Sequence, residues 1–249
     1  MTTNQKWDAV IIGGGHNGLV CAAYLAKAGR KVLVLESRHV LGGAAVTEEV
    51  HPGFHFSVCS YVVSLLRPKI IRDLNLARHG LEILPLDATF LPLPDGRSLA
   101  RWGDAGRTYD EIRKFSQRDA DQYGEFGLAM CKMSQFIGPI LEMTPPNPTS
   151  RNPIELMELL KLGKRFSNMP SAHRYGLTRL MTGSAVDLLD QWFESEPLKA
   201  TMSASGIIGT FLGVRSPGSA YVLLHHYMGQ IDGAYRAWGF AKGGTGGIS

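Results

Sequence analysis

One glycine-rich turn near the start of the chain constrains the fold more than any other feature. It reads Gly13-Gly14-Gly15-His16-Asn17-Gly18 and fits the pattern G-x-G-x-x-G. An apolar run at residues 8–12 precedes it, residues 17–28 carry apolar side chains at helical spacing, and residues 31–36 form a second apolar run. A strand, a helix and a strand in this order make a right-handed crossover in a parallel sheet. The turn therefore predicts an α/β fold that begins with a Rossmann-like βαβ unit.

The residues of this turn have separate mechanical roles in a dinucleotide site. Gly13 permits the tight turn, Gly15 lets the backbone approach a pyrophosphate, and Gly18 lets the helix pack closely on the strand. The positive end of the helix that follows favours the phosphates. His16 and Asn17 complete the turn, and we expect His16 to support the pyrophosphate rather than to perform chemistry.

The residues after the second strand indicate which dinucleotide is bound. Glu36 ends that strand, where a carboxylate can accept hydrogen bonds from ribose hydroxyls and would repel the 2′-phosphate of NADP. A second glycine pair, Gly42-Gly43, would let another backbone segment approach an extended dinucleotide, and it favours FAD over NAD. A Rossmann turn with another ligand, or a plain NAD dehydrogenase, is the alternative. The predicted cofactor-binding residues are Gly13, Gly15, His16, Asn17, Gly18, Glu36, Ser37, Arg38, Gly42, Gly43, Ala44 and Thr47.

The remaining sequence predicts a mixed, mostly helical insertion. Residues 88–101 read as a β-hairpin with Asp95-Gly96 as its turn. Helical patterns follow at residues 116–143, at 153–166, after a cap at Ser184, and from Ser216-Pro217 toward Met228. We therefore divide the chain into a FAD-binding domain at residues 1–85, a substrate domain at 86–235 and a return to the first domain at 236–249.

Composition narrows the class of protein. An apolar content of 44% and a charged content of 19% are typical of a soluble globular protein. The formal charge of +4 is small and scattered, which argues against a nucleic-acid partner. The three cysteines are far apart, so we expect no metal site and a reducing compartment. Few residues precede the first strand, and no apolar run is long enough to span a bilayer, so we expect a cytoplasmic protein and leave open contact with a membrane surface.

Several stretches resemble a known family. Residues 9–20, Leu35-Glu36-Ser37-Arg38 and Gly42-Gly43 resemble the phytoene-desaturase-like flavin oxidoreductases. Residues 52–57, 60–68, 218–226 and 238–246 are similar to the branch of pyridine nucleotide-disulfide oxidoreductase domain-containing proteins, and the resemblance runs from end to end of the chain.

The resemblance implies a non-covalent FAD and a partly helical substrate domain. It also implies hydride transfer from a hydrophobic, polyene-like substrate to the flavin, with oxygen, a quinone or a nicotinamide as acceptor. Three departures matter. Ala44 stands where many relatives have arginine, no close cysteine pair supports dithiol chemistry, and relatives are about twice as long. We therefore expect a truncated chain whose site for the flavin ring is incomplete.

No residue stands out as a catalyst, in keeping with chemistry that the flavin itself supplies. His225, His226 and Cys59 are the candidates, each with a plain structural role as the alternative. An amine-oxidase-like flavoenzyme and a flavin-binding regulatory protein without turnover are the rival functions. Self-association of the chain is left open.

Overall fold

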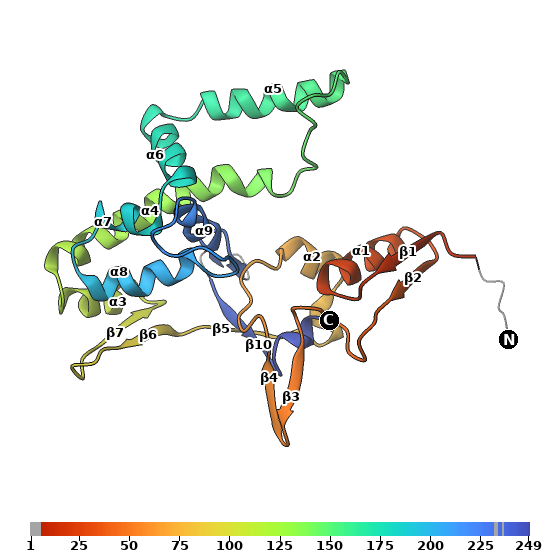
Figure 1. Ribbon diagram of the computed structural model, residues 1–249, viewed down its shortest axis with the longest axis horizontal. Coiled ribbons are helices and arrows are strands. Elements are labelled where there is room, and N and C mark those ends of the chain that lie inside the picture. Colours follow the sequence, from red (N-terminus) through yellow and green to blue (C-terminus); the bar gives the residue numbers. More distant parts are fainter. Residues whose placement is uncertain (1–5, 232–233, 236) are drawn as a thin grey trace. The chain divides into compact units, whose positions relative to one another are not determined.

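The structure is a computed structural model that describes residues 6–231, 234–235 and 237–249, shown in Figure 1. It divides into two compact units, one formed by the chain up to Leu86 together with Gly229–Ser249, and the other by Asp87–Met228. The second crossing lies before the boundary expected at 235 and 236, because Gln230 N donates to Ser64 O (2.9 Å) in the first unit. Residue 236, where the return was expected to begin, lies outside the described residues.

The first unit opens with the predicted βαβ arrangement. Strand β1 (Ala9–Ile12) pairs in parallel with β2 (Val32–Leu35), and helix α1 (His16–Lys27) connects them. Gly29 ends the helix with φ at +79°, a conformation that favours glycine, and its N–H donates to Ala26 O (2.9 Å). The fold class expected from the glycine turn is thereby confirmed.

The rest of the first unit consists of short elements. Strands β3 (Thr47–His51) and β4 (Phe54–Ser57) form an antiparallel hairpin. Strand β5 (Ile83–Pro85) pairs antiparallel with β10 (Gly239–Ala241), which joins residues more than 150 positions apart. The remaining elements are α2 (Pro68–Asp73), the 3₁₀ helices η1 (Leu76–His79) and η4 (Thr245–Ile248), and the strand pair β8 (Gln230–Ile231) and β9 (Ala234–Tyr235).

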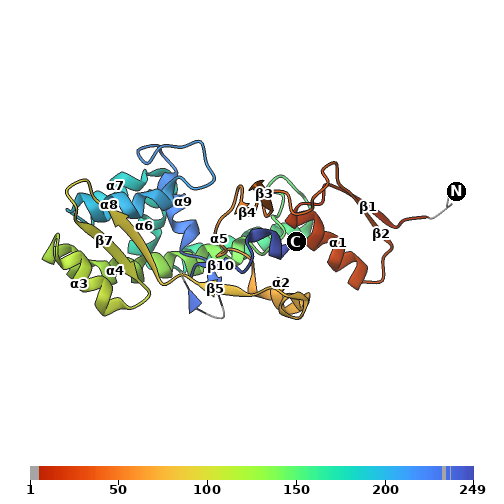
Figure 2. The ribbon, with the colours of Figure 1, turned by 90° about the horizontal axis from the view of Figure 1, so that it is seen from below.

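The second unit begins with the predicted hairpin. Strands β6 (Ala88–Pro92) and β7 (Ser98–Trp102) pair in the register Ala88 to Trp102, and Gly96 in the turn has φ at +84°. The hairpin is fixed to helix α3 (Ala105–Arg113), because Trp102 N donates to Thr108 Oγ1 (2.8 Å), and Figure 2 shows the elements side by side.

Helices make up the remainder of the second unit. They are α4 (Gln117–Ile137), η2 (Gly138–Ile140), α5 (Pro153–Ser167), α6 (Ser171–Thr182), α7 (Ala185–Asp190), α8 (Glu196–Ser203), η3 (Ala204–Gly206) and α9 (Ser219–His226). The expected caps are present, since Ser116 Oγ accepts from Asp119 N (3.1 Å) and Ser184 Oγ accepts from Asp187 N (3.0 Å).

Two helix limits differ from the predicted ones. Helix α4 ends at Ile137 rather than near residue 143, because Pro139 lacks an N–H and a 3₁₀ turn takes over. Helix α9 begins at Ser219, two residues after Pro217, because Gly218 adopts φ of +88°. No described helix has the length and hydropathy needed to cross a membrane.

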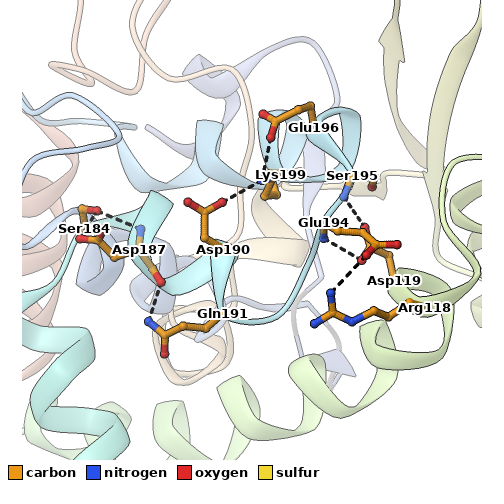
Figure 3. A network of polar contacts seen from close by, with 10 residues as sticks. All are labelled: Arg118, Asp119, Ser184, Asp187, Asp190, Gln191, Glu194, Ser195, Glu196 and Lys199. Carbon is orange, nitrogen blue, oxygen red and sulfur yellow. Dashed lines mark hydrogen bonds and ion pairs between the residues drawn. The ribbon is translucent and has the colours of Figure 1, made fainter.

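The core of the second unit is aromatic and closely tied to one buried carboxylate. Phe126 is 1% exposed and meets Phe193 and Trp192 edge to face, at centroid distances of 5.2 and 5.4 Å. The fully buried Asp119 accepts hydrogen bonds from the N–H groups of Glu194 (2.9 Å) and Ser195 (2.8 Å), as Figure 3 shows. This carboxylate fastens α4 to the segment before α8.

Candidate dinucleotide site

The glycine turn presents bare backbone at the N-terminus of helix α1. Gly13 has φ of +101° and donates to Leu35 O (2.7 Å), which fixes the turn between β1 and the helix. Gly15 caps the helix, no side chain caps it, and its first turn contains no acidic residue. The N–H groups and positive dipole end of a 12-residue helix therefore face an anion site without competition from the protein.

The first and last glycines of the fingerprint are explained by the space around them. A Cβ at Gly18 would lie 2.3 Å from Gly13 O, so this position tolerates only glycine. A Cβ at Gly13 would meet no atom within 4 Å, which leaves room for a ligand above it. Gly18 thus serves packing, as expected, and Gly13 serves the turn.

The second glycine pair is hydrogen-bonded directly to the first turn. Gly42 N donates to Gly14 O (2.8 Å) and Gly42 O accepts from His16 N (3.3 Å). A Cβ at Gly43, where φ is +62°, would be 3.0 Å from Gly15 Cα, and one at Gly42 would be 2.2 Å from Ala45 O. The two glycine segments therefore form one continuous backbone surface.

Glu36 is held at the edge of this surface by backbone donors. Its Oε1 accepts from Arg38 N (2.9 Å) and its Oε2 from Gly14 N (2.7 Å), and Ser37 Oγ donates to Oε1 at 3.3 Å. These hydrogen bonds, that from Arg38 first, hold the pKa of Glu36 below its usual value of 4.5. The carboxylate is thus ionised at neutral pH, and its remaining lone pairs can accept ribose hydroxyls.

Gly14 is a site residue that the sequence pattern did not single out, because it occupies a variable position of the fingerprint. A Cβ there would lie 2.5 Å from Leu41 Cδ2 and 3.3 Å from Glu36 Cβ. Its side-chain-free backbone is what lets Glu36 approach the turn.

The side chains after the second strand point to other partners. The guanidinium of Arg38 pairs with Glu48 (2.6 Å), and this hydrogen bond raises the pKa of Arg38. Thr47 Oγ1 accepts from Gly246 N (3.0 Å). Ala44 is exposed and adds no polar group to the site.

A second glycine-rich segment, residues 243–249, lies against the same loop and was not among the predicted site residues. Thr245 N donates to Ser57 Oγ (3.0 Å), and Ser249 Oγ donates to Ala45 O (3.1 Å). Thr245 is 1% exposed, and its Oγ1 is buried without a hydrogen-bond partner among the described residues. A buried orphan hydroxyl beside two glycine turns fits a polar ligand that completes its hydrogen bonding.

The three catalytic candidates occupy ordinary positions in their own units. Cys59 is exposed in the first unit. His225 and His226 lie on α9 in the second unit with ring centroids 6.1 Å apart. The ring of His226 is 2.8 Å from Val222 O, one helical turn back, and burial lowers its pKa. These contacts support structural roles for the histidines, and the described residues contain no cluster suited to a metal ion.

Comparison with known proteins gives matches for both the sequence and the fold. Residues 11–74 match the family described as NAD(P)-binding Rossmann-like domain. Pyridine nucleotide-disulfide oxidoreductase domain-containing protein 2 of Rattus norvegicus is 41% identical over 98% of this chain and 44% of its own length. One of the polypeptides of limonene dehydrogenase from Castellaniella defragrans is 41% identical over 54% of this chain and 25% of its own. All-trans-retinol 13,14-reductase of Macaca fascicularis is 30% identical over 97% of this chain and 38% of its own.

Among solved structures, a triple mutant of putrescine oxidase superposes with a TM-score of 0.56 at 18% identity, covering 97% of this chain and 47% of the other. This match shows a shared fold. The chain spans less than half the length of the curated relatives it matches.

Proposed function

The chain is a homologue of pyridine nucleotide-disulfide oxidoreductase domain-containing protein 2 and belongs to the flavin-type oxidoreductases, and from this premise we propose that its first unit binds FAD non-covalently. One observation carries the proposal. The second glycine pair is hydrogen-bonded to the first turn, so that two bare backbone segments lie side by side at the end of helix α1. An NAD site needs only the first of these segments, whereas a longer dinucleotide can use both.

Each part of the proposed site has a physical task. The pyrophosphate lies over Gly13 and Gly15, where the helix dipole and free N–H groups stabilise its charge. Glu36 accepts hydrogen bonds from the ribose hydroxyls, and its low pKa keeps it anionic, which disfavours a 2′-phosphate. The buried hydroxyl of Thr245 supplies a further polar contact from the second glycine-rich segment.

For the whole protein we propose oxidoreduction of a hydrophobic, isoprenoid-like substrate in the manner of phytoene desaturases. The names of two relatives refer to limonene and retinol, which are both apolar isoprenoids. Bound flavin would supply the redox chemistry by accepting or donating a hydride, and the protein supplies position and exclusion of water. Oxygen, a quinone and a nicotinamide remain the candidate acceptors.

Cofactor content is the direct test of this proposal. We would release bound dinucleotide from the purified chain by denaturation and measure FAD, before and after reconstitution with FAD, NAD and NADP. Near-equimolar FAD with no retained NAD or NADP supports the site. Retention of NAD in preference to FAD would contradict it. Peroxide release with amines but not with isoprenoids would instead favour an amine-oxidase-like reaction.

A matched pair of glycine variants links the cofactor to the site. Gly15→Val places a side chain over the turn and should abolish FAD retention. Gly124→Ala lies on α4, where a Cβ would meet no atom within 4 Å, and should retain FAD fully.

A further inference from the structure

Helix α5 presents an apolar face to solvent. The exposed fractions are 66% for Ile154, 51% for Met157 and 73% for Leu160, and none of its residues is fully buried. Figure 1 shows α5 at the edge of its unit, joined to α4 by a non-helical connection. Large apolar side chains at this level of exposure, gathered on one short helix, call for a partner surface.

The exposed side chains share one side of the helix. At about 100° per residue, Leu156, Leu160 and Met157 fall within roughly 100° of its circumference. Leu159 and Leu162 lie on the opposite side and are half-buried. Helix α5 therefore has an inner face that packs on its own unit, as well as an outer face that packs on nothing described.

Positive charge surrounds the outer face. Residues 151–174 contain five lysines and arginines and two glutamates, so this segment accounts for most of the formal charge of +4. Lys164 falls within the apolar arc, and no described carboxylate pairs with it. Lys161 pairs with Glu158 at 2.7 Å, and Arg165 donates to Gln135 O at 3.2 Å. An apolar stripe interleaved with cations matches the chemistry of an anionic lipid surface.

We propose that α5 lies flat in the headgroup region of an anionic membrane. Leu156, Met157 and Leu160 insert among the upper acyl chains, and Lys164 contacts lipid phosphates. The helix is 15 residues long, which is too short to span a bilayer but sufficient to lie along its surface. A second copy of the chain fits this face poorly, because it would bring lysines and arginines against lysines and arginines.

The proposal goes beyond flavin binding and does not depend on it. A membrane anchor on this unit would place the protein where apolar substrates dissolve. Failure to bind FAD would leave the lipid experiment interpretable, because α5 belongs to the unit that lacks the dinucleotide turn.

Vesicle co-sedimentation of the full 249-residue chain tests the proposal. The probes are vesicles of phosphatidylcholine alone and of phosphatidylcholine with phosphatidylserine. We expect binding to the anionic vesicles that weakens with added salt. The double variant Met157→Glu, Leu160→Glu should lower the partition coefficient at least about tenfold. Lys164→Glu should reduce binding to anionic vesicles while leaving weak binding to neutral ones unchanged.

Phe211→Glu is the matched control, because Phe211 is fully exposed on the loop before α9, away from the cations of α5. It should bind vesicles as the unaltered chain does. Equal loss of binding in this control, or no binding by the unaltered chain, would overturn the proposal. So would light scattering that shows a dimer which Met157→Glu, Leu160→Glu converts to a monomer without any change in vesicle binding. Circular dichroism of each variant confirms that the fold is retained.

Discussion

The N–H of Gly42 donates a hydrogen bond to the carbonyl oxygen of Gly14 at 2.8 Å, so the loop after the second strand is part of the same turn that opens helix α1. The bond joins two segments that the sequence separates by a helix and a strand. Every substitution that pushes these backbones apart is therefore expected to affect both the fold of the first unit and its dinucleotide.

Gly42→Ala is expected to destabilise the first unit and to release FAD. Its φ of +117° is unfavourable for any residue with a Cβ, and the added atom would lie 2.2 Å from a backbone oxygen. We expect a loss of about 2 kcal/mol or more in the free energy of unfolding, measured by urea denaturation. Gly124→Ala, the helical control, should change stability by less than about 1 kcal/mol. Unchanged FAD retention in Gly42→Ala would contradict the assignment of the second glycine pair to the site.

Glu36→Gln is expected to weaken FAD binding and to alter the pH dependence of stability. The pKa of Glu36 is lowered in the folded protein, so its stabilising contribution is complete above the unfolded value of 4.5 and is lost as pH falls through the folded pKa. The difference in melting temperature between the unaltered chain and Glu36→Gln should therefore be largest at neutral pH and shrink below pH 4.5. A difference that stays constant across this range would contradict the sign.

Asp119→Ala is expected to destabilise the second unit strongly. The carboxylate is fully buried, and its loss would leave the N–H groups of Glu194 and Ser195 without their acceptor. We expect a loss of about 2–4 kcal/mol in the free energy of unfolding. Asp121→Ala on the same helix removes an exposed carboxylate that accepts from Tyr109 and Gln117, and it should cost less than about 1 kcal/mol. Similar losses in both variants would show that burial of Asp119 carries no special weight.

His226→Gln is expected to leave FAD content unchanged and to remove a source of acid sensitivity. Burial lowers the pKa of His226 below its ordinary 6.5, so the folded state favours the neutral ring and loses stability as pH falls through that lowered pKa. The stability of the unaltered chain should fall relative to the variant in that window, followed by thermal melting. An isoalloxazine absorbance that depends on His226 at constant fold would instead indicate contact with the flavin.

Sequence reasoning succeeded where the signal is local. The turn at Gly13 and Gly18 and the caps at Ser116 and Ser184 each depend on residues within one turn of chain, so a short pattern contains all the information. The start of α9 was misplaced because a proline at 217 suggested a helix start, whereas the positive φ of Gly218 moved that start to the next residue.

The missed parts of the candidate site depend on contacts between distant segments. Nothing near Gly14 in the sequence reveals that Leu41 lies against it. The contacts of Thr245 with Ser57 and of Gly246 with Thr47 join positions 188 and 199 residues apart. Such pairings have no periodic signature, because each segment by itself reads only as a glycine-rich loop.

The hydrogen bond from Gly246 to Thr47 also has a kinetic consequence. A contact across 199 residues closes a long loop, and folds rich in such contacts form slowly. The backbone surface around Gly15 can form early from neighbouring segments, whereas its far wall waits for residues 243–249. Dinucleotide that binds only the finished site would draw the folding equilibrium toward it by mass action. In a cell, the supply of cofactor would then govern how long each newly made chain remains open to proteases.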